Sequence, residues 1–205
     1  MLIDTEQVDI DRLNLIFEVK ERKTGTISLG AGYSSVEGLV GYVQLTQNNL
    51  FGEGKAFSAD VQFGNQKKSW QLSYKDPWLF DTPTSLGVDV WNIFKNQLYN
   101  NQGYDDDSYG FDLSLGRRFT DEHKVYLTYR YQEDKYSNIQ PELQDLIKEE
   151  KTQLSSLTPM YIYDSRDNVF DASKGLYANI SLQIGGGYLG GDYNLSLIHI
   201  SDPTR

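Results

Sequence analysis

The stretch TGTISLGAGYSS, residues 24–35, alternates between two kinds of side chain. Apolar residues hold one parity and small or polar residues hold the other: Ile27, Leu29, Ala31 and Tyr33 against Thr26, Ser28, Gly30, Gly32 and Ser34. Strict alternation of this kind predicts a β-strand with two different faces. Glycine weakens a strand interior, because it costs backbone entropy and offers nothing to pack. The stretch therefore raises the question of what lies on each side of it.

The same alternation continues along the chain in both directions. It predicts one strand before this stretch and eight after it, at residues 13–21, 39–46, 55–64, 70–75, 86–90, 109–117, 125–132, 155–164 and 176–184. Strands of about 8–11 residues, tilted by roughly 45°, are long enough to cross the hydrocarbon core of a bilayer. Only residues 141–151, PELQDLIKEEK, look helical, and they lie inside a long polar insertion.

The composition excludes several classes of function. Nineteen Lys and Arg against 29 Asp and Glu give a net charge of −10, which argues against a nucleic-acid partner. The chain has no cysteine and only two histidines, His123 and His199, so thiolate metal sites and disulfides are impossible. A mean hydropathy of −0.54 fits a soluble protein, but it also fits a barrel whose strands alternate lipid-facing and lumen-facing residues.

Two all-β folds produce this pattern: a transmembrane β-barrel and a soluble β-sandwich. Three details favour the barrel. The strands are long, the polar parity is rich in Gly, Ser, Asn and Gln, and aromatic residues cluster at strand ends. Compact turns also alternate with longer loops, as they do in outer-membrane barrels. The sandwich remains the alternative on physical grounds.

Four separated motifs then point to a family. VKERKTGTISLGAGYSSVEGL (residues 19–39), NNLFGEGKAFS (48–58), YKDPWLF (74–80) and YDSRDNVFDASKG (163–175) resemble, in this order, the first half of the β-barrel of the BamA family and its superfamily. These proteins carry periplasmic POTRA domains in front of an outer-membrane barrel. The resemblance covers about residues 8–194.

The resemblance implies three parts of the chain. Residues 1–22 correspond to the end of a POTRA domain and residues 23–194 to the N-terminal part of an antiparallel transmembrane β-barrel. Residues 195–205, LSLIHISDPTR, break the pattern and resemble translated sequencing-adaptor sequence, so we expect them to be a non-native tail outside the fold. A genuine tenth strand is the alternative. The coding sequence is expected to be cut at both ends.

Candidate catalytic motifs are weak. GGGYLG, residues 185–190, lacks the following helix that a dinucleotide site needs. The acids of DSRD, residues 164–167, suit a hydrogen-bonded turn, and Asp105–Asp107 suit a solvated acidic loop better than a cation site. No serine nucleophile accompanies His123. The sequence therefore predicts no enzyme activity, no cofactor and no metal.

The resemblance implies instead an activity that depends on main-chain hydrogen bonds between strands. It places the first barrel strand at a weak seam where a client strand pairs, with Thr26, Ile27, Ser28, Leu29, Gly30, Ala31, Gly32 and Tyr33 as the pairing edge. Open strand edges attract other strands through main-chain hydrogen bonds. The small residues of this strand either keep the edge pliable or only permit sheet curvature.

The expected function is thus assembly and insertion of β-barrel proteins into the bacterial outer membrane, with the N-terminal end in the periplasm. Implied partners are unfolded outer-membrane proteins, outer-membrane lipid and lipopolysaccharide, and accessory assembly lipoproteins. A translocation-module or two-partner-secretion transporter of the same superfamily, and a passive porin or receptor barrel, remain alternatives.

Overall fold

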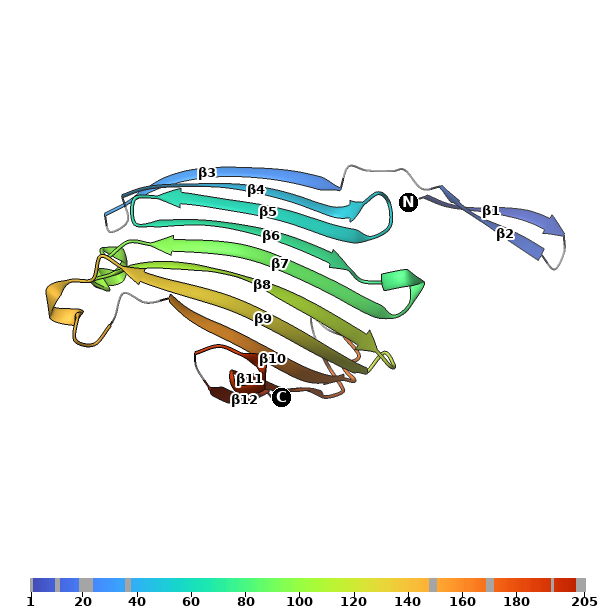
Figure 1. Ribbon diagram of the computed structural model, residues 1–205. Helices are drawn as coiled ribbons and strands as arrows, with labels where there is room; N and C mark the ends of the chain where they lie inside the picture. The colour runs from blue at the N-terminus through green and yellow to red at the C-terminus, as the bar shows by residue number, and fades with distance from the viewer. Residues whose placement is uncertain are drawn as a thin grey trace.

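The computed structural model describes residues 2–9, 12–18, 24–35, 38–147, 151–168, 172–192 and 194–201, with side chains from residue 24 onward. Within these residues the fold is all-β, with a separate two-stranded hairpin and one antiparallel sheet of ten strands. Figure 1 shows the ten strands side by side in a sheet that curves from β3 to β12. Every neighbour in the sheet is also a neighbour in sequence.

The strands of the sheet follow the chain in order. They are β3 (Gly25–Ser34), β4 (Gly38–Leu50), β5 (Lys55–Gly64), β6 (Lys67–Asp76), β7 (Thr84–Lys95), β8 (Asp105–Arg118), β9 (His123–Ser137), β10 (Lys151–Asp164), β11 (Tyr177–Gly185) and β12 (Leu195–Ser201). Four short 3-10 turns lie in the connections: η1 (Leu79–Asp81), η2 (Tyr99–Asn101), η3 (Pro141–Leu143) and η4 (Gly187–Leu189). The antiparallel arrangement and the ladder register confirm the expected fold class.

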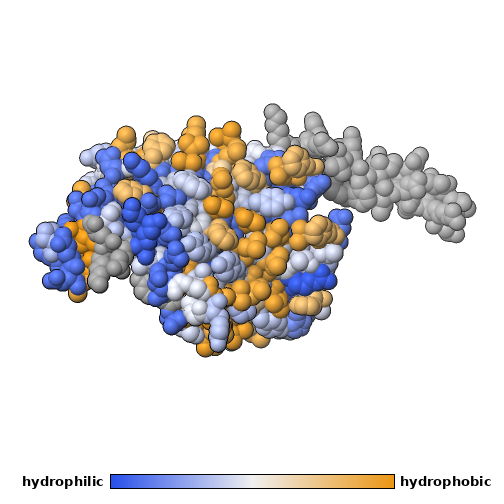
Figure 2. All heavy atoms as spheres, viewed as in Figure 1, coloured by the Kyte–Doolittle hydropathy of each residue, from blue (hydrophilic) through white to orange (hydrophobic). Residues whose placement is uncertain are grey.

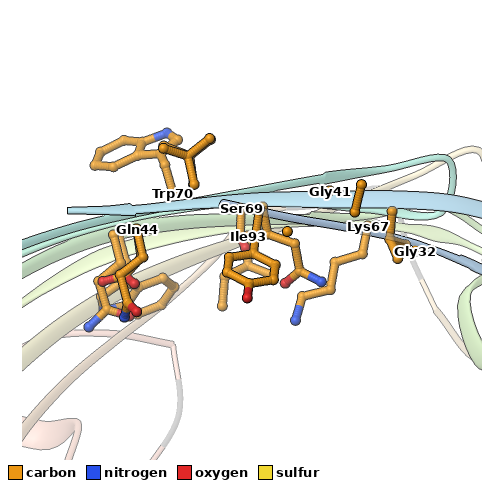
Figure 3. Close-up of a pocket in the computed structure, with 17 residues that line it drawn as sticks. Gly32, Gly41, Gln44, Lys67, Ser69, Trp70 and Ile93 are labelled. Atoms are coloured by element: carbon orange, nitrogen blue, oxygen red, sulfur yellow. The ribbon is translucent and has the colours of Figure 1, made fainter. Parts of the chain in front are cut away.

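The two faces of the sheet differ, as the alternation predicts. Cross-strand partners on one face form apolar rows, such as Leu29, Val43, Val61 and Trp70. The opposite face carries polar rows, such as Ser28, Gln44, Asp60 and Gln71. Figure 3 shows Trp70 on one side of the sheet and Gln44 and Lys67 on the other. We call these the apolar face and the polar face.

The sheet buries almost no hydrophobic core. Among the described side chains, Ile139 is the one buried hydrophobic residue, whereas large apolar residues are exposed along every strand from β3 to β12. Figure 2 shows hydrophobic residues gathered across the strands and hydrophilic residues gathered at the left-hand end. A sandwich would pack the apolar face against a second sheet. In the described residues no second sheet packs on the ten-stranded sheet, so these residues do not form a β-sandwich.

The polar face is held by short-range pairs between neighbouring strands. The Arg130 guanidinium of β9 donates two hydrogen bonds to the Asp112 carboxylate of β8, at 2.7 and 2.6 Å. Ser73 of β6 donates to Asp89 of β7 at 2.5 Å. These pairs connect adjacent strands on the polar face.

No helix in the described residues is long and apolar enough to cross a membrane. The helix expected over residues 141–151 is wrong for residues 141–147 and 151, and residues 148–150 lie outside the described part. Its place is taken by the 3-10 turn η3 and by turns up to Leu146, and Lys151 already begins β10. An isolated helix of this length is marginal in water, and the neighbouring strands continue beyond the expected ends instead.

Two further differences concern the ends of the chain. The strand expected at residues 13–21 is present as β2 (Arg12–Glu18), with residues 19–21 outside the described part, and it forms a hairpin with a strand that was not expected, β1 (Leu2–Asp9). Residues 195–201, expected outside the fold, form β12, which pairs with β11 from Gly185↔Leu195 to Asn179↔Ser201. Strand pairing uses main-chain groups, which every non-proline sequence supplies, so the non-native origin of this tail stays a prediction. Residues 202–205 lie outside the described part.

Candidate functional site

Strand β3 forms one edge of the sheet, because it pairs with β4 alone. Its apolar side chains are correspondingly exposed: 70% for Ile27, 72% for Leu29 and 81% for Tyr33. Val43 and Leu45, the partners of the first two on β4, are only 38% and 40% exposed, because they have a strand on each side. The structure thus places the predicted pairing residues 26–33 on one continuous open edge.

The ladder between β3 and β4 decides which backbone groups of β3 are free. The Asn48 N–H donates to the Thr24 carbonyl at 3.3 Å, so these two residues form a hydrogen-bonded pair. Such pairs alternate with non-bonded pairs along an antiparallel ladder. The register has no bulge between Gly25 and Ser34.

The alternation divides the predicted pairing residues into two sets. Even-numbered residues bond to β4: Thr26, Ser28, Gly30 and Gly32. Odd-numbered residues direct their N–H and C=O groups to the open edge: Ile27, Leu29, Ala31 and Tyr33. The sequence shows the parity of the side chains but not this division, because the division depends on where the β3–β4 pairing starts.

The polar face beside this edge carries a close contact between Gly30 and Tyr42. A Cβ added at Gly30 would lie 2.1 Å from Cε1 of Tyr42, so the tyrosine ring crosses directly over the glycine. The two residues are cross-strand partners. Sequence reasoning missed Tyr42, although an aromatic residue opposite a strand glycine is a known signal for such cover.

A hollow of about 910 Å³ opens on this part of the sheet. Its lining includes Gly30, Tyr42, Gln44, Lys67 and Trp91, which come from β3, β4, β6 and β7 (Figure 3). The lining mixes apolar side chains, glycines and polar side chains, with Asp60 and Lys67 as its charged residues, and it contains no histidine or paired carboxylates. The lining of the hollow therefore suits contact with a polypeptide or with water better than acid–base catalysis.

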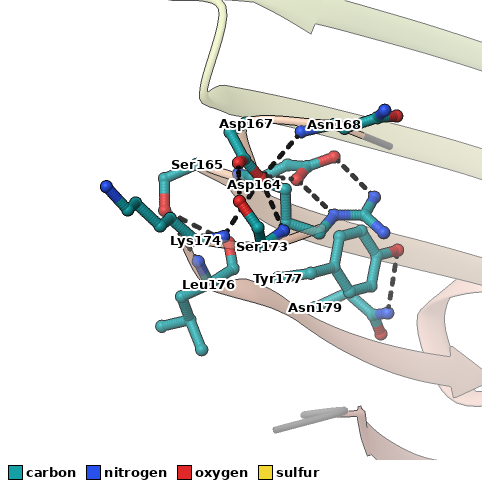
Figure 4. A network of polar contacts seen from close by, with 10 residues as sticks. Asp164, Ser165, Asp167, Asn168, Ser173, Lys174, Leu176, Tyr177 and Asn179 are labelled. Carbon is teal, nitrogen blue, oxygen red and sulfur yellow. Dashed lines mark hydrogen bonds and ion pairs between the residues drawn. The ribbon is translucent and has the colours of Figure 1, made fainter. Parts of the chain in front are cut away.

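The DSRD motif forms a hydrogen-bonded turn, as expected. Asp164 accepts hydrogen bonds from the Arg166 guanidinium at 2.8 and 2.9 Å, and Arg166 also lies 4.6 Å above the Tyr177 ring. Figure 4 shows Asp167 at the centre of a second group of bonds. Its carboxylate accepts the backbone N–H groups of Ser173 and Lys174 at 2.9 and 3.1 Å.

These bonds lower the pKa of Asp167 to about 2, first through the Ser173 hydroxyl and then through backbone N–H donors. The carboxylate is thus ionised at neutral pH, and its hydrogen bonds close the turn. Residues 169–171 lie outside the described part of this turn.

The remaining candidate motifs lie in strands and short turns. Asp105, Asp106 and Asp107 open strand β8 rather than a loop, and each has a separate partner: the Gln97 N–H, the Lys95 ammonium and the Asn92 amide. His123 contacts the Tyr161 hydroxyl at 2.6 Å. Gly187–Leu189 form a 3-10 turn and no helix follows in the described residues. Those residues contain no cluster of metal-ligating side chains.

Comparison with known proteins agrees with this geometry. The profile of the Omp85 superfamily domain matches residues 49–197. Two curated relatives named outer membrane protein assembly factor BamA align with most of the chain. The one from Neorickettsia risticii is 28% identical over 191 residues, which are 91% of this chain and 26% of the relative. The one from Nitratidesulfovibrio vulgaris is 29% identical over 200 residues, which are 93% of this chain and 24% of the relative.

The chain thus spans about a quarter of the length of these relatives. Among solved structures it resembles the crystal structure of BamA from Haemophilus ducreyi lacking POTRA domains 1–3. The TM-score is 0.61 at 23% identity, and the match covers 91% of this chain and 39% of that chain. This likeness shows the fold: the open sheet is similar to part of a BamA barrel.

Proposed function

Because the chain belongs to the Omp85 superfamily, we propose that it forms part of an outer-membrane barrel that assembles and inserts other β-barrel proteins. The work is done without covalent chemistry, through strand pairing at the edge of β3. Its substrates are unfolded outer-membrane proteins, and its surroundings are outer-membrane lipid and lipopolysaccharide. Accessory lipoproteins assist it, and residues 1–22 lie on the periplasmic side as the end of a POTRA domain.

The exposed apolar face supports the membrane part of the proposal. Water would penalise a sheet that exposes large apolar residues on every strand, whereas hydrocarbon accepts them. The polar face, with the Arg130–Asp112 pair and the hollow beside Tyr42, suits a water-filled lumen. Strands of 9 to 15 residues from β3 to β11 are long enough to span the hydrocarbon.

The open ladder of β3 is the observation that carries the proposal. Unpaired backbone groups in lipid cost several kcal/mol each, so an edge in the membrane needs a partner strand. Ile27, Leu29, Ala31 and Tyr33 direct one N–H and one C=O each to that partner. Main-chain bonding accepts many client sequences, because every non-proline residue supplies the same donor and acceptor.

We also propose that the pairing between β3 and a client strand can open again, and the small residues of β3 support this. Gly30 and Gly32 have no side chain to interlock with a partner strand, so little packing is lost when a pairing strand leaves. A strand with bulky residues on both parities would hold its partner more firmly. The edge thus binds a client strand through backbone hydrogen bonds. It releases that strand readily, because few side-chain contacts hold the two strands together.

Disulfide crosslinking in the full-length protein tests the proposal. Cysteines replacing Thr26 or Ser28 should crosslink to cysteines in the last strand of a client that is being assembled. Ser73→Cys on β6 is the matched control, because Ser73 faces the same side but has a strand on each side. Equal crosslinking of Ser73→Cys, or crosslinking only at distant strands, would contradict the seam. A passive porin or a secretion transporter would give no link to a client's strand at either position.

A further inference from the structure

Aromatic rings cover four glycines inside the ten-stranded sheet. In each case the ring belongs to the residue directly opposite on a neighbouring strand, in the pairs Gly30–Tyr42, Gly41–Phe63, Gly110–Trp91 and Gly116–Tyr126. A Cβ added to any of these glycines would lie 2.1–2.9 Å from an atom of that ring, so each ring lies across the bare backbone of its partner. We call these four the covered glycines.

The cover has a physical reason. Glycine leaves the backbone of a strand open to water and gives its neighbours nothing to pack against. A ring that lies across the glycine removes this backbone and part of its own apolar surface from water, which stabilises the strand. Accordingly, Gly41, Gly110 and Gly116 are buried and Gly30 is half-buried.

Gly32 of β3 has no such cover. Beyond its chain neighbours, a Cβ added there would meet one atom within 4 Å, Cγ2 of its β4 partner Val40 at 3.9 Å, and Gly32 is exposed. Gly87 also lacks a ring, but it has a strand on each side, with Lys75 and Ser114 as its partners. Gly32 differs, because β4 is the only strand beside it. By the pattern of the covered glycines, a ring for Gly32 comes from a strand that pairs at the open edge.

We propose that a client strand paired with β3 places an aromatic residue opposite Gly32, and that its ring covers Gly32 on the polar face and sets the register of the pairing. The inference rests on the client-strand pairing proposed above, and it assigns one sequence feature to the client. The hollow beside β3 offers room for the ring, since its lining includes Gly32 and Val40 as well as Tyr42 (Figure 3).

The open edge favours one position for this ring. Even-numbered residues of β3 bond to β4, so an antiparallel client strand meets Gly32 in a non-bonded pair, in which the two side chains lie closest. Two residues along, the place over Gly30 already holds the Tyr42 ring. Ser28 and Ser34 carry side chains of their own. A slip by one residue would turn the ring to the other face, so an aromatic residue opposite Gly32 fixes the register.

Disulfide exchange between the full-length protein and three peptides tests this inference. Each peptide has nine residues, with threonine at odd and valine at even positions, and a cysteine replaces the threonine at position 7. The first peptide has tyrosine at position 3, which lies opposite Gly32 when the cysteine lies opposite Ser28 in an antiparallel pairing. The second keeps threonine there, and the third has tyrosine at position 5, opposite Gly30. Ser28→Cys, without other reactive cysteines, is equilibrated with each peptide in detergent and glutathione buffer, and the mixed disulfide is measured.

We expect Ser28→Cys to link the first peptide about two- to fivefold more than the second, the gain from one cross-strand aromatic contact. A gain of this size still lets a client strand leave the edge. The third peptide should link no better than the second, because the Tyr42 ring already lies over Gly30. Equal linking of the first and second peptides, or an equal gain for the third, would overturn the cover of Gly32 and leave the strand pairing intact. If no peptide forms a link, the pairing at β3 fails and this inference fails with it.

A second substitution identifies the glycine. Gly32→Ala adds a methyl group with no close contact in the sheet, but this group would occupy the place of the client's ring. In Ser28→Cys with Gly32→Ala, the ratio of linking between the first and second peptides should therefore fall to about one. Ser28→Cys with Gly87→Ala is the matched control and should keep the ratio, because Gly87 lies inside the sheet, where an added Cβ meets its nearest atom at 3.5 Å. If the ratio survived in the Gly32→Ala variant, the ring would lie elsewhere and the proposal would be wrong.

Discussion

At the scale of single residues, the sheet depends on how closely strands approach one another. Gly110 of β8 is the clearest case, because a Cβ there would lie 2.3 Å from the backbone carbonyl oxygen of Tyr131 and 2.9 Å from the Trp91 ring. The carbonyl belongs to the β9 ladder and cannot move away alone. At Gly87 of β7, by contrast, the nearest atom to an added Cβ is Cβ of Ser114 at 3.5 Å, an ordinary contact.

Two alanine substitutions should therefore differ. Gly110→Ala should lower the free energy of unfolding by about 1–3 kcal/mol, because the backbone must shift to admit the methyl group. Gly87→Ala should leave it unchanged or raise it by about 0.4–1 kcal/mol, because alanine reduces the freedom of the unfolded chain. Urea unfolding of the full-length protein in detergent measures both. Equal destabilisation by the two variants would show that the close approach at Gly110 is not specific.

At the scale of the element, β3 has two edges with different tasks. One edge bonds to β4 through its even-numbered residues, and the other presents the backbone groups of its odd-numbered residues. Neighbouring positions on the same strand therefore contribute to different interfaces. A substitution that removes only the backbone N–H group can separate the two.

Proline at adjacent positions makes this separation. Ala31→Pro removes an N–H directed to the open edge, so it should spare the β3–β4 hairpin and slow client assembly by roughly fivefold, the equivalent of one hydrogen bond. Gly32→Pro removes an N–H bonded to Val40 and should weaken the hairpin itself. Hydrogen exchange of the β4 amides and the rate of client assembly distinguish the two results. If Ala31→Pro lost the protection of the β4 amides from hydrogen exchange, the assignment of odd-numbered residues to the open edge would be wrong.

At the scale of the whole molecule, the sheet has two uncovered edges, β3 and β12, and one uncovered apolar face. Its ten strands pair only with their sequence neighbours, so no strand pairing in the described residues closes the sheet. A closed barrel removes both edges, and the chain covers 39% of the BamA chain that it resembles.

The polypeptide of residues 1–205 alone should therefore not form a stable monomer. In detergent we expect strand pairing between copies at β3 and β12, and hence a broad distribution of masses by light scattering. The full-length protein under the same conditions should give one species. A single monomeric species of residues 1–205 with full β-sheet content would show that the edges are protected in another way.

Sequence and tertiary structure contribute different parts of this description. The strands from β3 to β11, and the face on which each of their side chains lies, follow from the sequence, because period-two alternation is local. The turn at Asp164–Asp167 was also predictable, since Asp and neighbouring donors close turns within a few residues. The resemblance to the BamA family predicted a pairing edge at residues 26–33, and β3 is an edge strand of the described sheet.

Only the tertiary structure decided which backbone groups of that edge are free, since this depends on the register between β3 and β4. It also revealed the close approach at Gly110, the cover of Gly30 by Tyr42, and the left-handed backbone of Phe51 and Phe80, with φ of 57° and 54°. These features depend on contacts between neighbouring strands or on backbone φ angles, and the alternation of side chains in the sequence predicts neither. The strand TGTISLGAGYSS is thus specified by its own residues, whereas its role as an edge is set by which strand lies beside it.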